Sequence, residues 1–101
     1  MLYLDLKTPR EVRLDIAAKA KEQRLSLNIS QNELAQRSGV SLGSVKRFES
    51  TGLISLPSLL EIALVLGRMQ DFDTLFAAPK NPASLFAPEP KKRLRSGRAK
   101  K

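Results

Sequence analysis

Two short amphipathic segments separated by a single glycine constrain the fold of this chain more than any other feature. Ser30 is a favoured N-cap residue, and Glu33, three positions later, completes the capping-box pattern that opens a helix. Gly39 can adopt the left-handed conformation that ends a helix without a Cβ clash. Ser41 can then cap a second helix. The sequence therefore predicts two short helices joined by a tight turn.

Apolar positions assign an inward face to each of these two helices. Leu34 and Ala35 face inward on the first, and Val40 fills the angle between them. Val45 and Phe48, three positions apart, form the apolar stripe of the second. A first helix that braces a second, whose polar face stays free for the DNA major groove, is a helix-turn-helix.

The pattern continues in register beyond these helices. It reads Q-x-x-L-A-x-x-x-G-V-S from Gln31, followed by Phe48-Glu49 and by an Ala-x-x-Leu-Gly run that ends at Gly67. The chain thereby resembles the Xre/Cro-type repressor domain over roughly residues 12–76. The resemblance implies an all-α fold: a five-helix repressor-like helix-turn-helix domain, with a short N-terminal arm and a disordered basic C-terminal tail.

The residue types present exclude several classes of chemistry. Without cysteine or histidine, the chain has no disulfides, no thiol chemistry and none of the usual zinc ligands. There is also no nucleophile–base pair and no Gly-rich phosphate loop. We therefore expect a protein that is not an enzyme and that has no metal and no cofactor.

Hydropathy gives no sign of a membrane or secretory segment. No run of 18 apolar residues occurs, and the first six residues lack the basic region of a signal peptide. We expect a cytoplasmic, nucleoid-associated protein without a membrane partner.

The net charge of +8 is concentrated at one end. Residues 91–101 contain seven Lys/Arg and no acid, whereas residues 1–90 carry a net charge of only +1. Any DNA affinity of the globular part must therefore come from a local basic patch. The tail residues expected to contact DNA are Lys91, Lys92, Arg93, Arg95 and Arg98.

Composition divides the chain into four regions. Residues 1–7 form an arm whose weak alternation fits either a short strand, which would need a partner, or a loosely packed segment. Residues 8–78 form the domain, and residues 79–90 a proline-rich linker. Residues 91–101 form the basic tail.

Capping signals predict three further helices. Thr8-Pro9 begins a helix that should run to about Leu25. Another should begin at Leu56 or Pro57 and stop at Gly67, and Asp71 should cap a fifth helix over Phe72–Phe76. The inward face predicted for the first helix contains Val12, Ile16, Ala17, Ala20 and Arg24, and Leu27 and Ile29 should close the corner after it.

Apolar residues exceed what one small core needs around the fourth and fifth helices. This surplus predicts a self-association face and a homodimer, and its members are Leu53, Ile54, Leu56, Leu60, Leu64 and Val65. The alternative is that the arm or residues 84–87 cover this surface within one chain.

The resemblance implies a structural ion pair and a set of DNA-contacting positions. Arg24, seven residues before Gln31, is expected to pair with Glu49. Arg47 is the one conventional base reader, because its guanidinium can give guanine two hydrogen bonds. The positions expected to contact DNA are Gln31, Ser41, Leu42, Gly43, Ser44, Lys46, Arg47 and Thr51.

Two functions fit these features. The first is a dimeric transcriptional repressor on a palindromic double-stranded operator. In addition, the Ser-Leu-x-Ser-Leu-Leu and Asp-Phe-Asp-x-Leu-Phe runs and the basic tail resemble HipB-like antitoxins. That resemblance implies an autorepressor that also binds a HipA-type kinase toxin. A stand-alone or phage-type regulator is the alternative.

Overall fold

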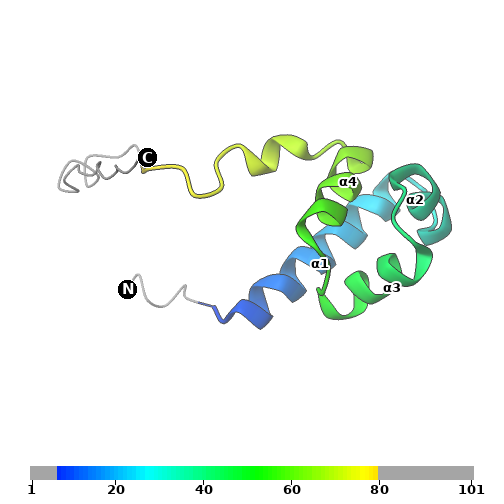
Figure 1. Cartoon of the computed structure of the whole chain (residues 1–101), viewed down its shortest axis with the longest axis horizontal. Helices are drawn as coiled ribbons and strands as arrows, with labels where there is room; N and C mark the ends of the chain where they lie inside the picture. Colours follow the sequence, from blue (N-terminus) through cyan, green and yellow to red (C-terminus); the bar gives the residue numbers. More distant parts are fainter. Residues whose placement is uncertain (1–6, 80–101) are drawn as a thin grey trace, which may run out of the picture. The chain divides into compact units, whose positions relative to one another are not determined.

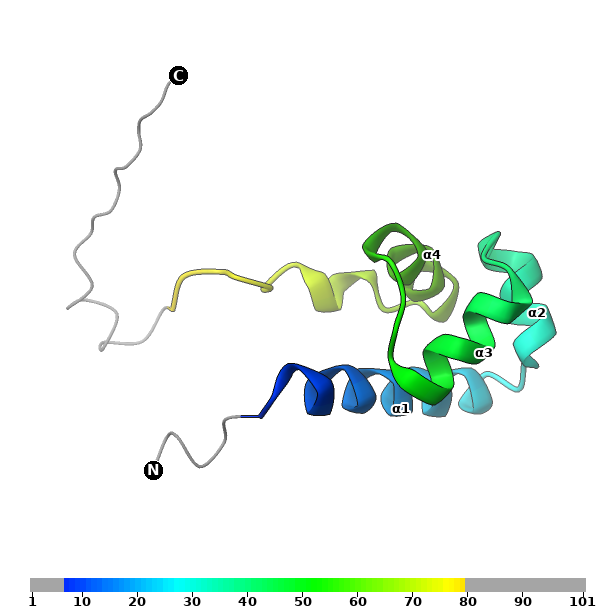
Figure 2. The same cartoon turned by 60° about the horizontal axis from the view of Figure 1, so that its bottom comes forward.

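The computed structural model describes residues 7–79, and every regular element in that range is helical. The helices are α1 (Pro9–Ser26), α2 (Gln31–Ser38), α3 (Leu42–Thr51) and α4 (Leu56–Leu66), followed by a one-turn 3-10 helix, η2 (Met69–Phe72). α1 is the longest, and α3 and α4 both pack on it, while α2 packs on α3 and α4 (Figures 1 and 2). The all-α prediction is confirmed for the part of the chain that the structure describes.

The helices begin where the capping residues predict. Thr8 and Ser30 each form a complete capping box, with Glu11 and Glu33 respectively. Ser41 and Ser55 cap α3 and α4 by accepting hydrogen bonds from Ser44 N–H and Ser58 N–H. Side chains therefore satisfy amide groups that the first turn of each helix leaves without a backbone partner. Three helices end at glycines with positive φ, namely Gly39, Gly52 and Gly67.

The core lies between the four helices. Phe48, Leu34, Ile62 and Val45 are its largest fully buried side chains. The other buried apolar residues are Ala17, Ile29, Ala35, Val40, Ala63 and Leu66.

Pro9 and Pro57 lie in the first turns of α1 and α4, where the missing N–H costs no hydrogen bond.

The inward face predicted for α1 is partly wrong. Ala17 and Arg24 are buried and Ala20 packs against the core, but Val12 and Ile16 are each 41% exposed. The five predicted positions span too wide an arc of the helix for one neighbouring surface to cover. Leu27, expected at the corner after α1, is also exposed, whereas Ile29 is buried.

The predicted fifth helix over Phe72–Phe76 is wrong. The chain there makes isolated turns, with Leu75 N–H donating to Phe72 O and Ala77 N–H to Thr74 O. Phe76 has a φ of 63° and is 98% exposed. A segment this short cannot repay the cost of helix nucleation unless it buries an apolar face. The only helical turn in this region among the described residues is η2.

The described residues fall into two units. α1 to α4 lie in a unit that ends at Gln70, and the residues from Asp71 onward belong to a second unit. Several predictions lie outside the described residues: the arm over residues 1–6, the linker from residue 80, the island at residues 84–87 and the tail at residues 91–101. Lys7, the last residue of the predicted arm, forms an ion pair with Asp15 of α1.

Within residues 7–79, no single helix has both the length and the apolar composition needed to cross a membrane. α3 and α4 meet that test, by length and composition alone, only as a pair bent by 93°.

Candidate nucleic-acid interface

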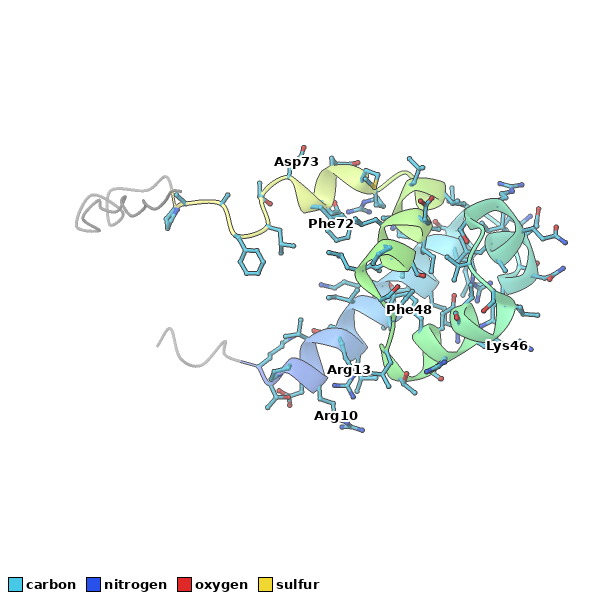
Figure 3. All side chains as sticks on the ribbon, in the orientation of Figure 1. Arg10, Arg13, Lys46, Phe48, Phe72 and Asp73 are labelled. Carbon is cyan, nitrogen blue, oxygen red and sulfur yellow. The ribbon has the colours of Figure 1, made fainter. Side chains whose placement is uncertain are left out.

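The outer side of α3 is open. Gly43, Lys46 and Arg47 are exposed, and Ser44 is half-buried. A Cβ added to Gly43 would meet no atom within 4 Å, so this stretch of backbone has free space beside it. Figure 3 shows Lys46 on the outside of α3, whereas Phe48 points into the domain. The predicted contact positions Gly43, Ser44, Lys46 and Arg47 therefore share one accessible side.

Leu42, whose contact with DNA stays a prediction, also has a structural role. It is half-buried and packs against the core cluster, so its side chain helps to anchor the start of α3. Its position at the first residue of α3 accounts for this, because Val40 and Val45 lie on either side of it in sequence and are both buried.

A shallow groove runs beside the exposed face of α3. It has a volume of about 250 Å³ and adjoins the start of α4. Ser44 and Arg47 contribute donors to it, and apolar side chains from the connection between α3 and α4 form another wall. The remaining lining residues are Leu53, Ile54, Ser55 and Ser58. A surface of this kind offers both hydrogen bonds and apolar contact to a ligand.

The two serines at the start of α3 are linked to each other. Ser41 Oγ accepts from Ser44 N–H at 3.1 Å and donates to Ser44 Oγ at 2.9 Å. Ser41 is therefore the helix cap. Ser44 Oγ, as the acceptor in that bond, keeps its own proton to donate outward.

Thr51 has a structural role that the sequence analysis missed. α3 extends to Thr51. The Thr51 hydroxyl donates to Arg47 O at 2.7 Å and accepts from Leu53 N–H at 3.1 Å. Because both interactions close the end of α3, the hydroxyl is already used within the domain. The contact of Thr51 with DNA stays a prediction.

Arg13 is a second residue that the sequence analysis missed. Its Nε donates to Thr51 O at 3.0 Å, which satisfies a carbonyl at the C-terminus of α3. Gly52 lies against the same residue: a Cβ there would come within 2.6 Å of Arg13 O. Helical spacing places Arg13 on the inner side of α1 next to Ala17, but nothing in the local sequence indicates a partner 38 residues away.

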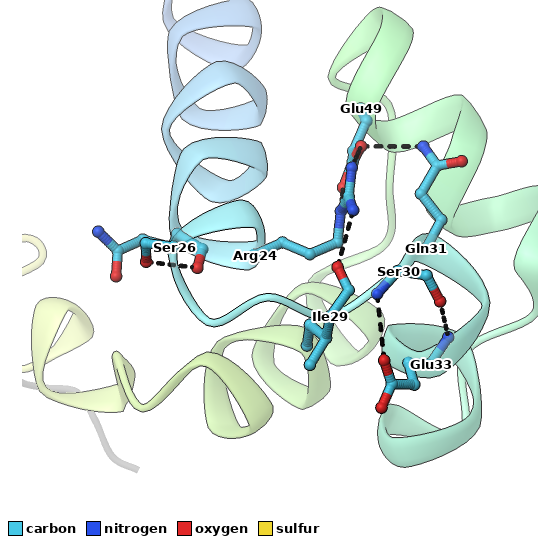
Figure 4. A network of polar contacts seen from close by, with 8 residues as sticks. Arg24, Ser26, Ile29, Ser30, Gln31, Glu33 and Glu49 are labelled. Carbon is cyan, nitrogen blue, oxygen red and sulfur yellow. Dashed lines mark hydrogen bonds and ion pairs between the residues drawn. The ribbon is translucent and has the colours of Figure 1, made fainter.

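A buried polar network joins α1, α2 and α3 at one end of the domain (Figure 4). Arg24 Nε donates to Glu49 Oε2 at 2.7 Å, and Arg24 Nη2 donates to Glu49 Oε1 at 3.0 Å. Arg24 Nη1 reaches Ile29 O at 3.0 Å, and Gln31 Nε2 donates to Glu49 Oε1 at 2.9 Å. The side chains of Arg24 and Glu49 are only 7% and 5% exposed. The structure thus brings together Arg24 and Glu49, the expected pair, and adds Gln31 to them.

Opposing effects act on the pKa of Glu49. Burial alone would raise it, because the charged form loses its hydration. Hydrogen bonds from Arg24 and Gln31, together with the positive charges of Arg24 and Lys21, outweigh burial and hold the pKa of Glu49 below its ordinary value. Glu49 is therefore a carboxylate at neutral pH, and the network is a true ion pair.

Gln31, which is predicted to contact DNA, has a protein partner in the structure. It is the first residue of α2 and is half-buried. One N–H of its amide is taken by Glu49. An amide nitrogen carries two hydrogens, so a second N–H remains available. The predicted tail contacts, from Lys91 to Arg98, lie outside the described residues.

Comparison with known protein families gives one match over part of the chain. Residues 21–69, just under half of the chain, match the model of the family described as helix-turn-helix. The match runs from the second half of α1 to the start of η2. The match supports a DNA-binding regulator of the Xre type. Members of the matched family are DNA-binding regulator domains and not enzymes. No curated protein and no solved structure matches the chain.

Proposed function

We propose that this protein is a sequence-specific transcriptional repressor that binds a palindromic operator as a homodimer. The observation that carries the proposal is the open outer side of α3, where Lys46 and Arg47 are exposed within a region that matches a DNA-binding family. Their charges attract the phosphate backbone, and the Arg47 guanidinium can reach a guanine edge. Repression follows from occupancy, because a bound dimer excludes polymerase from the promoter.

The experiment is a salt-titrated binding assay on the duplex upstream of the protein's own gene, with an unrelated duplex of equal length as the control. Arg47→Ala should weaken specific binding by about 1–3 kcal/mol and reduce the preference for the specific duplex. Arg10→Ala, which removes an equally charged and exposed side chain from α1, is the matched control. If wild type binds neither duplex at low salt, the function is wrong.

The proposed dimer uses α4. Leu56, Leu60 and Leu64 follow one another at four-residue spacing, and Leu56 and Leu64 are 59% and 61% exposed. A ridge of this spacing can pack against its own copy across a two-fold axis. In such a pair, Leu56 of one copy contacts Leu64 of the other, and Leu60 contacts Leu60. Leu64→Asp should therefore dissociate the dimer in sedimentation analysis. Leu25→Asp, at a similarly exposed leucine of α1, should leave it intact.

The tail supplies a second, sequence-independent contact in this proposal. Its seven basic residues can neutralise up to seven phosphates. Deleting residues 91–101 should lower the affinity for every duplex and reduce the slope of log K against log salt by up to about 6. An unchanged slope would remove the tail from the mechanism.

We also propose that the repressor is an autorepressing antitoxin of a HipBA-like system. The support is the resemblance of the Ser55–Leu60 and Asp71–Phe76 runs to HipB-like antitoxins. The partner would be a HipA-type kinase toxin encoded beside it. Co-purification of a kinase with the tagged protein supports this role. A gene neighbourhood without a kinase leaves the stand-alone regulator.

A further inference from the structure

The side-chain amide of Gln31 donates a hydrogen bond to the buried carboxylate of Glu49, whose own position is fixed by Arg24. Glu49 Oε1 accepts hydrogen bonds from Gln31 Nε2, at 2.9 Å, and from Arg24 Nη2, at 3.0 Å. Arg24 and Glu49 are almost completely buried, whereas Gln31 is half-buried and reaches the surface. The contact therefore connects the interior to a side chain at the N-terminus of α2.

The Glu49 carboxylate cannot move without disturbing contacts among α1, α2 and α3. Arg24 Nε closes a second bond to Glu49 Oε2 at 2.7 Å, and a bidentate pair of this kind fixes the carboxylate plane. Arg24 Nη1 also donates to Ile29 O at 3.0 Å, one residue before the N-cap of α2. The orientation of the Gln31 amide is thus set during folding, and the rotamer entropy of this long side chain is lost before any ligand arrives.

We propose that Glu49 is a positioning residue for DNA binding. By accepting one N–H of Gln31, it directs the other N–H toward a phosphate beside the N-terminus of α2. Backbone N–H groups and the positive end of the helix dipole favour an anion at the same place. This inference rests on the proposed function, because it requires that the protein bind DNA.

Three possible roles of Glu49 predict different effects of Glu49→Gln on the folded protein. If Glu49 acts only as a negative charge near DNA, its removal strengthens binding. If it acts only as a structural ion pair, its removal lowers the melting temperature and leaves the affinity of the folded protein unchanged. If it positions Gln31, binding weakens even though the protein has become more positive. The sign of the change therefore separates the roles.

The experiment measures affinity for the duplex upstream of the protein's own gene by fluorescence anisotropy, below the melting transition of every variant. Glu49→Gln, Gln31→Ala and the double variant form a cycle, and Glu61→Gln is the control. Glu61 is exposed on α4, so this change adds the same charge without touching the network. Loss of one oriented hydrogen bond should weaken binding about fivefold in each single variant. The double variant should lose no more, because both changes remove the same contact.

Several results would overturn the inference. Glu49→Gln binding DNA as tightly as Glu61→Gln would exclude positioning, and so would single-variant losses that multiply in the double variant. If Glu49→Gln does not fold, Glu49→Asp serves instead, because it keeps the charge but retracts the carboxylate by one methylene group. It should show the same fivefold loss, and an unchanged affinity overturns the inference. Wild type failing to bind any duplex overturns the proposed function as well, so the two failures are distinguishable.

Discussion

The two sides of α3 are determined by different requirements. On the inner side, Val45 and Phe48 are fully buried, and Glu49 shares its carboxylate among donors from two other helices. On the outer side, Lys46 and Arg47 are exposed, and neither side chain forms an ion pair with another residue among residues 7–79. Folding therefore specifies the residue types on the inner side and leaves those on the outer side to function.

The two glycines of this region show the same contrast. Gly52 has a φ of 78°, and a Cβ there would come within 2.6 Å of Arg13 O. Gly43 lies in the first turn of α3, with nothing within 4 Å of the place where a Cβ would stand. The fold requires glycine at 52, whereas at 43 only an external partner would require it.

The largest effect is expected from breaking the buried network on the inner side. Glu49→Ala leaves the Arg24 guanidinium buried without its counter-ion, so unfolding should become easier by about 3 kcal/mol or more. Urea denaturation at pH 7 measures this loss, and a near-neutral effect would contradict the role of the pair.

The same network predicts how stability depends on pH. The pKa of Glu49 is lowered by folding, so the carboxylate stabilises the protein above its ordinary pKa, about 4.5. This stabilisation is lost as the pH falls through the lower, folded pKa. In denaturation series between neutral and acid pH, Glu49→Gln should lack this component, while Glu61→Gln should retain it.

Gly52→Ala should have the next largest effect. It combines left-handed backbone strain with a collision against the backbone of α1, for a combined cost of about 3 kcal/mol. Gly39→Ala is the matched control, because Gly39 has nearly the same φ, 77°, and open space around it. It should cost only about 1 kcal/mol in the same thermal melts. Equal losses in the two variants would show that the contact with Arg13 is unimportant.

Gly43→Ala should have the smallest effect, and it should be opposite in sign. Alanine is the better helix former, so the free protein should become more stable by about 0.5 kcal/mol. If DNA approaches the backbone at this position, the same variant should bind its duplex more weakly. Thermal melts and anisotropy titrations on one preparation measure both quantities.

The sequence predicted features that depend on neighbouring residues and did not predict contacts between residues far apart in the chain. The starts of α1 to α4 were predictable because capping is local chemistry carried by Thr8, Ser30, Ser41 and Ser55. The ion pair between Arg24 and Glu49 came from family resemblance, whereas Gln31, the third residue of the network, was expected only to contact DNA. The contacts of Arg13 with Thr51 and Gly52 join residues 38 and 39 positions apart, so no local pattern could reveal them.

Other errors have their origin in packing. Val12 and Ile16 fit the helical period of an inward face, but period alone does not give the width of the neighbouring surface. The segment predicted as a helix over Phe72–Phe76 had a cap and apolar residues, but Leu75 and Phe76 are exposed. Periodicity locates helices well when a core supports them and poorly at the edge of a domain.

The central claim, that the outer side of α3 meets DNA, is tested most directly by NMR. Amide shifts of the labelled protein would be followed as the duplex upstream of its gene is added. We predict that the largest changes occur between Leu42 and Arg47 and at Gln31, while the outer side of α4 around Leu64 stays unchanged on DNA addition. Changes confined to α4 or to the outer face of α1, with Leu42–Arg47 unaffected, would contradict the account.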